Sequence, residues 1–546
     1  MRPIGSRLVL VSVVVLEMFS QAYAATANVP LYGVHELSFK GPHMTARDCP
    51  ARDVELVTLW KHEDSGSSVR LCGFWDGDGK GAPAGNVYKV RFCPPRQGVW
   101  TLVETKSNRS ELKGRKQGYS IRCTASNHPG FWIPDAETRG RWYRRSGGSH
   151  PYIFGDTLYS FLSEYKVDGP TGGNIRDDVI NTSKYFNKIR FSISPDRYPH
   201  PRVKPFLDDD GRPTDDGSYC HRPNPAWWSG RVDLAVQTAF EMDQIADLIL
   251  NGPDAYESRC ILKAAKNGGD ATPYLRYIAA RYGSYPNVWI CLCNEFDIKK
   301  PNYSTKEIVR LGTTMRKFLP NPTSMSVHAK QRDWYRELNE GPWHDHVIIQ
   351  KKIKTLPVAA DWVSRNYAIG GNVPVIDDEL AYEGKGDGWS EGDVIESHLG
   401  AFLGGGYGTT GHKPASKQGH YFWGNFKPEE HLAADNLKWL REQIDNNITF
   451  WKMSPAPPAK DDGGRTSIFS NVHAEFRAMQ WRDHEYVLGS NRPRSRLKAN
   501  LPAGRWTVTR YDVVARKQRV LHDGARDAVE FDTPDSRAVL FHFKRR

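Results

Sequence analysis

Two glutamates that follow apolar segments are the residues of this sequence best suited to do chemistry. Glu295 follows the strand-like run in "NVWICLCNEFD" (287–297), and Glu379 ends "VPVIDDE" (373–379). Two facing carboxylates can hydrolyse a glycosidic bond, because one protonates the leaving oxygen while the other attacks the anomeric carbon or activates water. A single strand-end glutamate is more often part of a salt bridge, but a matched pair favours catalysis. We therefore take Glu295 and Glu379 as candidate catalytic residues.

The two cysteines that precede Glu295 raise the alternative of a metal or redox site. Cys291 and Cys293 are separated by one residue, whereas structural zinc hairpins place about two to four residues between their cysteines. On a strand these two side chains share a face and point the same way, which disfavours a mutual disulfide. We expect both to be buried core residues. With no phosphate loop, dinucleotide fingerprint or serine nucleophile elbow, the sequence predicts neither a metal nor a cofactor.

The elements that must position the glutamates begin after Gly140. Eight segments with strand character follow one another, with amphipathic helical patterns between them. They are residues 151–156, 187–194, 245–250, 287–293, 323–329, 346–350, 373–379 and 405–412. Eight strands that alternate with helices predict a (β/α)8 TIM barrel. The carboxyl ends of all its strands open on one face, so Glu295 on the fourth strand and Glu379 on the seventh are expected to share one cleft.

Further polar and aromatic residues lie at the ends of the same strands or in the loops that follow. Each could bind a carbohydrate substrate, or else belong to a structural ion pair or the core. The candidate substrate-binding residues are Asn294, Asp156, Arg190, His328, Gln350, Tyr382, His412 and Trp423. Trp423 is the preferred platform for a sugar ring. Trp227 and Trp228, in a long early loop, are the next candidates, although anchoring of that loop in the core is an equally good explanation.

Three acids compete with Glu379 for the role on the seventh strand. Strand alternation places Asp377 on the same face as Glu379 and Asp378 on the opposite face. We therefore expect Asp377 in the barrel interior below the site, and Asp378 against the helices or the next strand. Glu383, beyond the strand, is expected to hold a loop or a substrate hydroxyl.

The regions on either side of the barrel are rich in short strands punctuated by turns. This pattern predicts an Ig-like β-sandwich over residues 25–138 and a second β-sandwich over residues 459–546, with the catalytic barrel at 139–458. The expected fold class is thus a multidomain chain in which a (β/α)8 TIM barrel is flanked by an N-terminal and a C-terminal β-sandwich.

The first 24 residues have the layout of a secretory signal peptide. Arg2 and Arg7 precede the apolar run Leu8–Leu16, and Ala22–Ala24 reads as an A-x-A cleavage site. We expect a secreted or periplasmic protein with no membrane span, since no later segment has 18 uninterrupted apolar residues. Export also predicts one or two disulfides within a group of four cysteines, and Cys220 and Cys260 could form another, although the sequence does not decide the connectivity. The group consists of Cys49, Cys72, Cys93 and Cys123.

The net charge of +12 raises the question of an acidic partner. Lysines and arginines are scattered, and no run is dense enough to form a nucleic-acid patch. We therefore expect no nucleic acid, while an acidic polysaccharide stays open as a partner. The oligomeric state is not decided by the sequence.

Two motifs resemble those of a known group of enzymes. "CNEF" after the fourth strand and "PVIDDELAYEG" at the seventh resemble the signatures of clan A retaining glycoside hydrolases. Together with "YIFGDTLYSFL" and the N-terminal sandwich, they are similar to secreted bacterial barrel proteins assigned as glycosidases. Those proteins carry an N-terminal domain of unassigned function and a C-terminal sandwich labelled as a collagen-binding domain.

This resemblance implies a role for three residues. Glu295 would be the general acid/base, Glu379 the nucleophile, and Asn294 the partner of the sugar's 2-hydroxyl. It also implies double displacement, with carboxyl groups roughly 5–5.5 Å apart, an ionised Glu379 and a raised pKa for Glu295. The rival hypothesis is a non-catalytic carbohydrate- or matrix-binding protein on the same scaffold. The presence of both glutamates argues against it.

Overall fold

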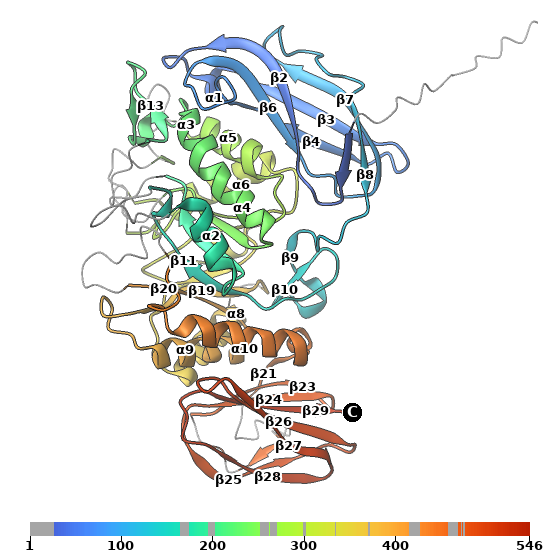
Figure 1. Cartoon of the computed structure of the whole chain (residues 1–546), viewed down its shortest axis with the longest axis vertical. Helices are drawn as coiled ribbons and strands as arrows, with labels where there is room; N and C mark the ends of the chain where they lie inside the picture. Colours follow the sequence, from blue (N-terminus) through green and yellow to red (C-terminus); the bar gives the residue numbers. More distant parts are fainter. Residues whose placement is uncertain are drawn as a thin grey trace, which may run out of the picture.

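The computed structural model describes most of the chain. It covers residues 27–546 except 164–173, 195–202, 252–260, 263–269, 299–301, 334, 370–371, 414–425, 457–467, 471 and 473–474. The expected signal peptide, Trp423 and Cys260 lie outside the described residues. No helix within the described part is long and apolar enough to cross a membrane. Figure 1 shows three units in a row, with the barrel between two sheet-rich ends.

The N-terminal unit contains two sheets around one core. The larger sheet has the order β1 (Ala27–Pro30), β8 (Ser120–Thr124), β7 (Gly98–Ser107), β3 (Leu56–His62) and β4 (Ser68–Cys72). The smaller sheet has the order β2 (His35–Met44), β6 (Gly85–Phe92) and β5 (Phe74–Trp75). Trp60, Phe92 and Trp100 lie between them, with Trp60 stacked on Phe92 at a centroid distance of 4.7 Å.

Eight parallel strands form the central barrel. Their order is β17 (Ser324–Ser326), β16 (Val288–Cys291), β15 (Ile245–Ile249), β12 (Lys188–Ser192), β11 (Phe154–Thr157), β20 (Tyr407–His412), β19 (Val375–Glu383) and β18 (Val347–Ile349). The two edges of this order meet through a parallel bridge between His328 and Ile348, which closes the barrel. Each strand overlaps one of the eight segments predicted from the sequence.

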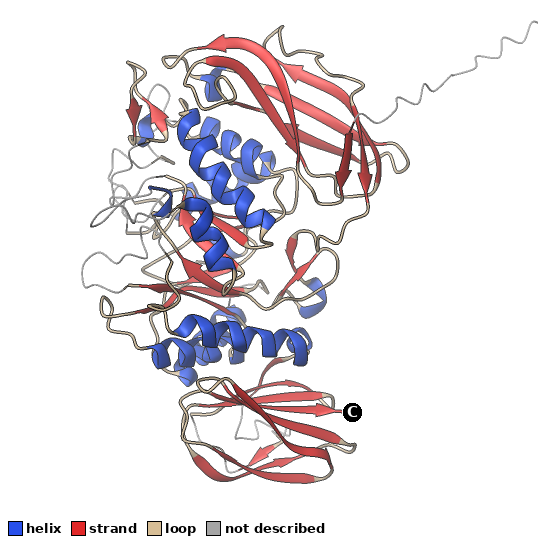
Figure 2. Ribbon diagram, viewed as in Figure 1, coloured by secondary structure: helices blue, strands red, loops and turns tan. Residues whose placement is uncertain are grey.

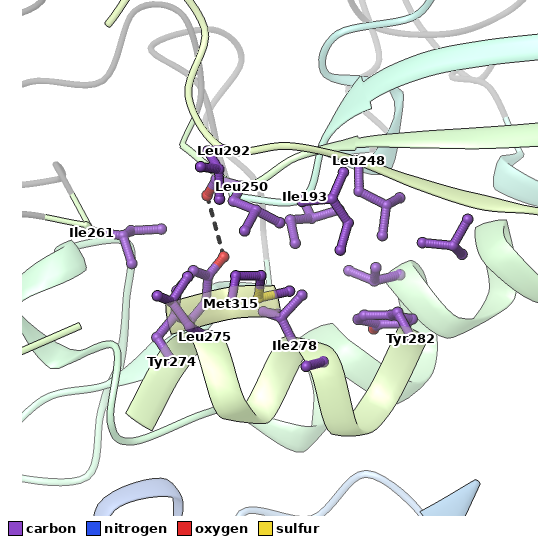
Figure 3. Packing of buried hydrophobic residues seen from close by; sticks show 14 of the residues in the cluster. Ile193, Leu248, Leu250, Ile261, Tyr274, Leu275, Ile278, Tyr282, Leu292 and Met315 are labelled. Carbon is purple, nitrogen blue, oxygen red and sulfur yellow. Dashed lines mark hydrogen bonds between the residues drawn. The ribbon is translucent and has the colours of Figure 1, made fainter. Parts of the chain in front are cut away.

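Helices follow the strands in turn and cover the outside of the barrel (Figure 2). They are α2 (Ile175–Ser183), α3 (Pro225–Trp227) with α4 (Asp233–Glu241), α5 (Thr272–Tyr282), α6 (Thr305–Phe318), α7 (Arg336–Asn339), α8 (Leu356–Ile369), α9 (Glu391–Leu403) and α10 (Ala433–Asn447). Figure 3 shows Leu275 and Ile278 of α5 packed against Leu248 of β15 and Leu250, which follows that strand. Burial of such apolar side chains contributes about 1.5–3 kcal/mol each.

A short hairpin closes the end of the barrel where the strands begin. It pairs β9 (Trp132–Pro134) with β10 (Tyr143–Arg145) and lies between the N-terminal unit and the first barrel strand. The Tyr143 hydroxyl lies 2.5 Å from Oγ of Ser324 and 2.8 Å from Nδ1 of His346, next to the first residues of β17 and β18. The opposite end, where the strands finish, is thereby left for the site.

The C-terminal unit again contains two sheets around one core. The larger has the order β21 (Ser454–Ala456), β23 (Arg477–Trp481), β24 (Glu485–Ser490), β29 (Val539–Arg545), β26 (Trp506–Asp512) and β27 (Lys517–Ala525). The smaller has the order β22 (Phe469–Ser470), β25 (Arg494–Asn500) and β28 (Ala528–Thr533). Arg537 joins this unit to α9 through Asp393 at 2.8 Å and Glu396 at 3.1 Å. The expected fold class is confirmed.

The disulfides expected in the N-terminal unit are wrong. The structure holds Cys49, Cys72, Cys93 and Cys123 as free thiols. Cys49 is engaged elsewhere, since Nε of Arg222 donates to its Sγ at 3.2 Å. Cys93 follows β6 and Cys123 lies in β8, and burial raises the pKa of both thiols.

The other described cysteines lie in the barrel. Cys220 is a buried thiol, and Cys260, its expected partner, is among the residues outside the description. Cys291 and Cys293 are fully buried, which confirms that they are core residues.

Candidate active site

Glu379 reaches the open end of the barrel through an irregularity in β19. The pairing of β19 with β20 matches Asp377 to Gly408 but Ala381 to Thr410, so β19 carries two extra residues in this interval. Such a bulge changes the face on which a side chain lies. The carboxylate of Glu379 points into the site, and the residue is 5% exposed.

The bulge also corrects the expected positions of the neighbouring aspartates. Asp378 lies in the barrel interior, where its Oδ1 accepts hydrogen bonds from Lys188 at 2.6 Å and Thr409 at 2.7 Å. Asp377 instead accepts from the backbone amides of Lys351 at 3.2 Å and Glu379 at 3.3 Å. The prediction from strict alternation is therefore wrong for both, because the alternation does not continue from Asp377 to Glu379.

Glu295 lies just past β16 in a turn rather than on the strand. Its backbone has a φ of +48°, a left-handed conformation that is costly for a residue with a side chain. Preceding residues Leu292 and Cys293 are fully buried, so the turn lifts the carboxylate from a rigid strand end. Such strain is concentrated at functional sites in proteins.

One amide joins the two glutamates. Nε2 of Gln350, just after β18, donates to Oε1 of Glu295 at 2.9 Å and to Oε2 of Glu379 at 2.6 Å. Because both oxygens accept from the same nitrogen, they lie at most 5.5 Å apart. The structure therefore brings together the two candidate catalytic residues predicted from the sequence.

A second donor chain holds the other oxygen of Glu379. Nη1 of Arg190 donates to the hydroxyl of Tyr159 at 2.7 Å, and that hydroxyl donates to Oε1 of Glu379 at 2.5 Å. The same guanidinium nitrogen lies 3.9 Å from Oε1, and the hydroxyl of Tyr382 lies 3.2 Å from that of Tyr159. Both oxygens of Glu379 are thus fixed by donors, which orients the carboxylate.

Tyr159 was not among the candidates taken from the sequence. It follows β11 by two residues in "GDTLYS", so the strand-end criterion did not reach it. An aromatic residue with a hydroxyl group just beyond the first strand was the signal that could have found it.

Asn294 is held so that its amide nitrogen is available. Its Oδ1 accepts from Nη2 of Arg190 and contacts Nδ1 of His328. No residue in the described part of the chain accepts a hydrogen bond from its Nδ2, although this atom is buried. A buried donor without an acceptor is costly and favours a ligand that supplies one.

Below the site the barrel holds a buried group of four charges. Nζ of Lys188 lies 2.9 Å from Asp247 and 2.6 Å from Asp378, and Nε of Arg190 lies 3.7 Å from Asp378. All four side chains have no exposed surface. The two cations and two carboxylates offset each other, which fixes Arg190 under Asn294 and Tyr159.

Asp156 and His412 belong to a different cluster. Asp156 lies 3.8 Å from Nε2 of His431, whose Nδ1 donates to Glu383 at 2.5 Å. The rings of His412 and His431 stack with centroids 5.5 Å apart. Burial, the largest influence, raises the pKa of Asp156 to about 7. The structure thus groups these two predicted binding residues with His431 rather than with the carboxylate pair.

Glu383 anchors the start of α10. Its oxygens accept from the backbone amides of Leu432 and Ala433, each at 3.0 Å. It is the last residue of β19 rather than a residue beyond the strand. This confirms the expectation that Glu383 holds a loop.

Trp227 and Trp228 do not offer a surface to a sugar. Both are almost fully buried, and their indole nitrogens donate to the carbonyls of Ile193 and Pro205, each at 2.9 Å. They anchor the long loop after β12. Trp423, the preferred platform, is outside the described residues.

The electrostatics of Glu379 combine opposing influences. Burial raises the pKa of Glu379 most strongly, Arg190 opposes that effect, and the neighbouring Glu295 raises it further. The hydrogen bond from Tyr159 and the nearby Lys352 lower it. The net direction is upward, so the expected ionised state of Glu379 depends on these donors. Within the described residues no group of acids, histidines and cysteines could hold a metal ion.

Comparison with known proteins supports a glycosidase-like barrel. Residues 181–414 match the family model of the Apiosidase-like catalytic domain, and residues 28–108 match a domain of unknown function, DUF5060. No curated protein matches the sequence.

Solved structures share the fold at low sequence identity. A candidate glycoside hydrolase from Bacteroides vulgatus is 21% identical, with a TM-score of 0.74, covering 95% of this chain and 100% of that one. A glycoside hydrolase family 5 protein from the same organism is 14% identical, with a TM-score of 0.58 over 76% of this chain and 93% of that one. The chain therefore has the fold of glycoside hydrolases and, over residues 181–414, resembles the Apiosidase-like catalytic domain in sequence.

Proposed function

We propose that this protein is a retaining glycoside hydrolase in which Glu379 is the nucleophile and Glu295 the general acid/base. One observation carries the proposal: Gln350 donates to both carboxylates, so their nearest oxygens are at most 5.5 Å apart. Retaining enzymes place their carboxyl groups about 5–5.5 Å apart, whereas inverting enzymes need roughly 6.5–9.5 Å to admit a water molecule. The spacing supports direct attack on the sugar.

The proposed reaction has two displacement steps. The carboxylate of Glu379 attacks the anomeric carbon, the bond to the leaving oxygen breaks, and protonated Glu295 gives its proton to that oxygen. Ionised Glu295 then takes a proton from water, whose oxygen displaces Glu379 from the anomeric carbon. Water is the only co-reactant, and the configuration of the sugar is retained.

The surroundings of each carboxylate support this assignment of roles. Glu379 accepts hydrogen bonds from Tyr159 and Gln350 and lies near Arg190, which favours the charged form that a nucleophile needs. Glu295 is the more exposed of the two, at the rim where the leaving group and water must enter and exit.

The free amide of Asn294 supports recognition of the sugar beside the anomeric carbon. With Oδ1 occupied by Arg190, Nδ2 can donate to the 2-hydroxyl of the sugar bound to Glu379. Hydrogen bonds to this hydroxyl strengthen in the transition state and contribute several kcal/mol. We infer that Asn294 stabilises the transition state more than the bound substrate.

The sequence match guides the choice of substrates to assay. We propose a polysaccharide, or an oligosaccharide derived from one, and apiosides are the first compounds to assay because of the model matched by residues 181–414. Because the first 24 residues have the layout of a signal peptide, we further propose that the protein acts after export.

Hydrolysis by matched variants tests the proposal. The purified protein and the variants Glu379→Gln and Glu295→Gln are assayed against apiosides and against plant and bacterial glycans. The control is Glu396→Gln, because the carboxylate of Glu396 contacts Arg537 of the C-terminal unit and not the carboxylate pair. We expect both site variants to lose hydrolysis while the control retains it. Full activity in Glu379→Gln would contradict its role as the nucleophile. Glycan binding without any hydrolysis by the unaltered protein would favour the non-catalytic binding alternative.

A further inference from the structure

The N-terminal unit contains a cavity that the catalytic proposal does not use. Its volume is about 980 Å³, at the upper end of the usual range for ligand pockets. It lies over β2 and β6, which run side by side in Figure 1, and between the turns at 78–80 and 111–116. Every residue that lines it belongs to the N-terminal unit.

The lining carries more cations than anions. It includes Lys40, Lys80, Lys89, Arg115 and Lys116, against Glu36, Asp78 and Glu111. Only Lys89 is neutralised locally, since its Nζ lies 2.9 Å from Glu36 and 2.8 Å from buried Asp76. Glu36 also accepts from Arg91 at 3.0 Å, so it offers little charge to the cavity.

The other four cations have no carboxylate of their own. In the described part of the chain, no acidic group forms an ion pair with any of them, and all four are exposed. They are Lys40, Lys80, Arg115 and Lys116. An exposed array of cations around a concavity attracts an anionic ligand and raises its rate of association.

The two remaining acids are partly occupied. Oδ1 of Asp78 accepts from the backbone amides of Lys80 at 2.7 Å and Ala82 at 3.0 Å, and Glu111 accepts from Ser110 at 3.0 Å. These contacts stabilise the turns that bear the cations. The cavity therefore keeps a net positive charge.

The rest of the lining is mostly apolar. It consists of Phe39, Gly41, Gly79 and Val87, together with the polar Ser38. A Cβ at Gly41 would meet the ring of Tyr88 at 2.6 Å, so this position is restricted to glycine. Nζ of Lys116 lies 5.7 Å from the centroid of the Phe39 ring, which places a cation beside the apolar part. An apolar surface with a cationic rim matches a sugar ring that presents C–H groups on one face and carboxylates at its edge.

We propose that this cavity is a non-catalytic binding site for a carboxylated oligosaccharide. The choice of a glycan rests on the proposed glycosidase function, while the anionic character rests on Lys40, Lys80, Arg115 and Lys116. Such a site holds an acidic polysaccharide on the N-terminal unit while the barrel acts on another part of the same polysaccharide. The two functions use separate residues, so each can fail without the other.

Calorimetric titration of the full chain with a tetragalacturonide tests this site. The protein carries Glu379→Gln to prevent hydrolysis, and the fully methyl-esterified tetragalacturonide serves as a probe of equal length without charge. We expect the acid to bind and the ester to bind at least about tenfold more weakly, because the ester lacks the charge-assisted hydrogen bonds that a carboxylate makes with the cations. The affinity for the acid is expected to fall as salt is added.

Charge-reversal variants locate the binding. Lys40→Glu and Lys116→Glu are each expected to weaken binding of the acid at least about tenfold. Lys113→Glu, exposed in the same turn as Lys116 but outside the cavity lining, is the matched control and is expected to bind as before. Unchanged circular dichroism spectra show that all variants fold.

Three results would overturn the inference. They are no binding of the acid, equal binding of acid and ester, and equal effects of Lys113→Glu and Lys116→Glu. None of them bears on hydrolysis. Conversely, a protein that binds the acid through Lys116 yet hydrolyses no glycoside would contradict the proposed catalytic function alone.

Discussion

The hydroxyl of Tyr159 donates to Oε1 of Glu379 at 2.5 Å, although 220 residues separate them in the chain. The hydrogen bond stabilises the carboxylate and lowers the pKa of Glu379 against the upward effect of burial. Tyr159 in turn receives a hydrogen bond from Arg190, so the guanidinium acts on Glu379 both directly and through the phenol.

Removal of this hydroxyl should shift the pH dependence of hydrolysis. In Tyr159→Phe the pKa of Glu379 rises, and because the nucleophile must be ionised, the acidic limb of the profile moves to higher pH. We expect kcat/KM at the optimum to fall about 10- to 100-fold, in line with the loss of one hydrogen bond to a charged group. Rates measured from pH 4 to 9 check this.

The control for Tyr159 is Tyr285→Phe. Tyr285 is also buried, but its hydroxyl accepts from Gln237 in the helical layer. The acidic limb of the pH profile of Tyr285→Phe should stay where it is in the unaltered protein. A general loss of activity in Tyr159→Phe without a shift of that limb would contradict an electrostatic role.

Gln350 should matter through its N–H groups rather than its volume. Gln350→Glu puts a third carboxylate next to Glu295 and Glu379, which raises their pKa values by like-charge repulsion. Gln350→Met keeps the length without the donor. We expect kcat/KM to fall in both, and about tenfold further in the glutamate variant at neutral pH. Equal losses in the two variants would assign Gln350 a packing role.

Asn294 should discriminate between substrates that differ only at the 2-hydroxyl. The unaltered protein is expected to prefer the natural glycoside over its 2-deoxy analogue, because Nδ2 has no other acceptor among the described residues. In Asn294→Ala this preference should shrink by about 10²- to 10³-fold, with the loss in kcat rather than KM. The four kcat/KM values form a cycle, and a preference that survives in the variant would refute the contact.

The buried charges below the site should govern stability at low pH. Lys188 holds the pKa of Asp378 well below its usual range, although burial acts in the opposite direction. A carboxyl with a depressed folded pKa contributes stability above its unfolded pKa of about 3.9, and this stability is lost as pH falls through the folded value. We expect Asp378→Asn to lower the unfolding free energy at pH 7 by about 3–5 kcal/mol, because Lys188 and Arg190 lose a buried partner.

Asp361→Asn provides the comparison for Asp378. Asp361 pairs with Arg477 at 2.5 Å, but its side chain is 63% exposed, so its removal should cost no more than about 1 kcal/mol. Calorimetric melting of the variants at pH 7 and pH 3 measures the difference. If Asp378→Asn melts like Asp361→Asn at pH 7, the buried charges do not stabilise the barrel.

Much of the barrel could be predicted from the sequence because its strands are apolar and regularly spaced. The runs that end before Asn294 and Glu379 had the length and composition of buried strands, and parallel strands end on one face. That reasoning was enough to place Glu295, Glu379 and Gln350 together.

Other features depend on contacts that a linear pattern does not contain. The bulge in β19 exchanges the expected positions of Asp377 and Asp378, since register is set by pairing with β20 rather than by alternation alone. Asp156 lies against His431, which comes just before α10 and more than two hundred residues after Asp156 in the sequence. The prediction of disulfides in the N-terminal unit was wrong because an oxidising compartment does not by itself place two cysteines within bonding distance.

The stereochemistry of hydrolysis tests the central claim most directly. A glycoside that the protein cleaves is followed by proton NMR from the first minutes, before the free sugar equilibrates its anomeric centre. Because Gln350 keeps the carboxylates of Glu295 and Glu379 at most 5.5 Å apart, the first product should have the anomeric configuration of the substrate. A first product of opposite configuration would contradict double displacement through Glu379.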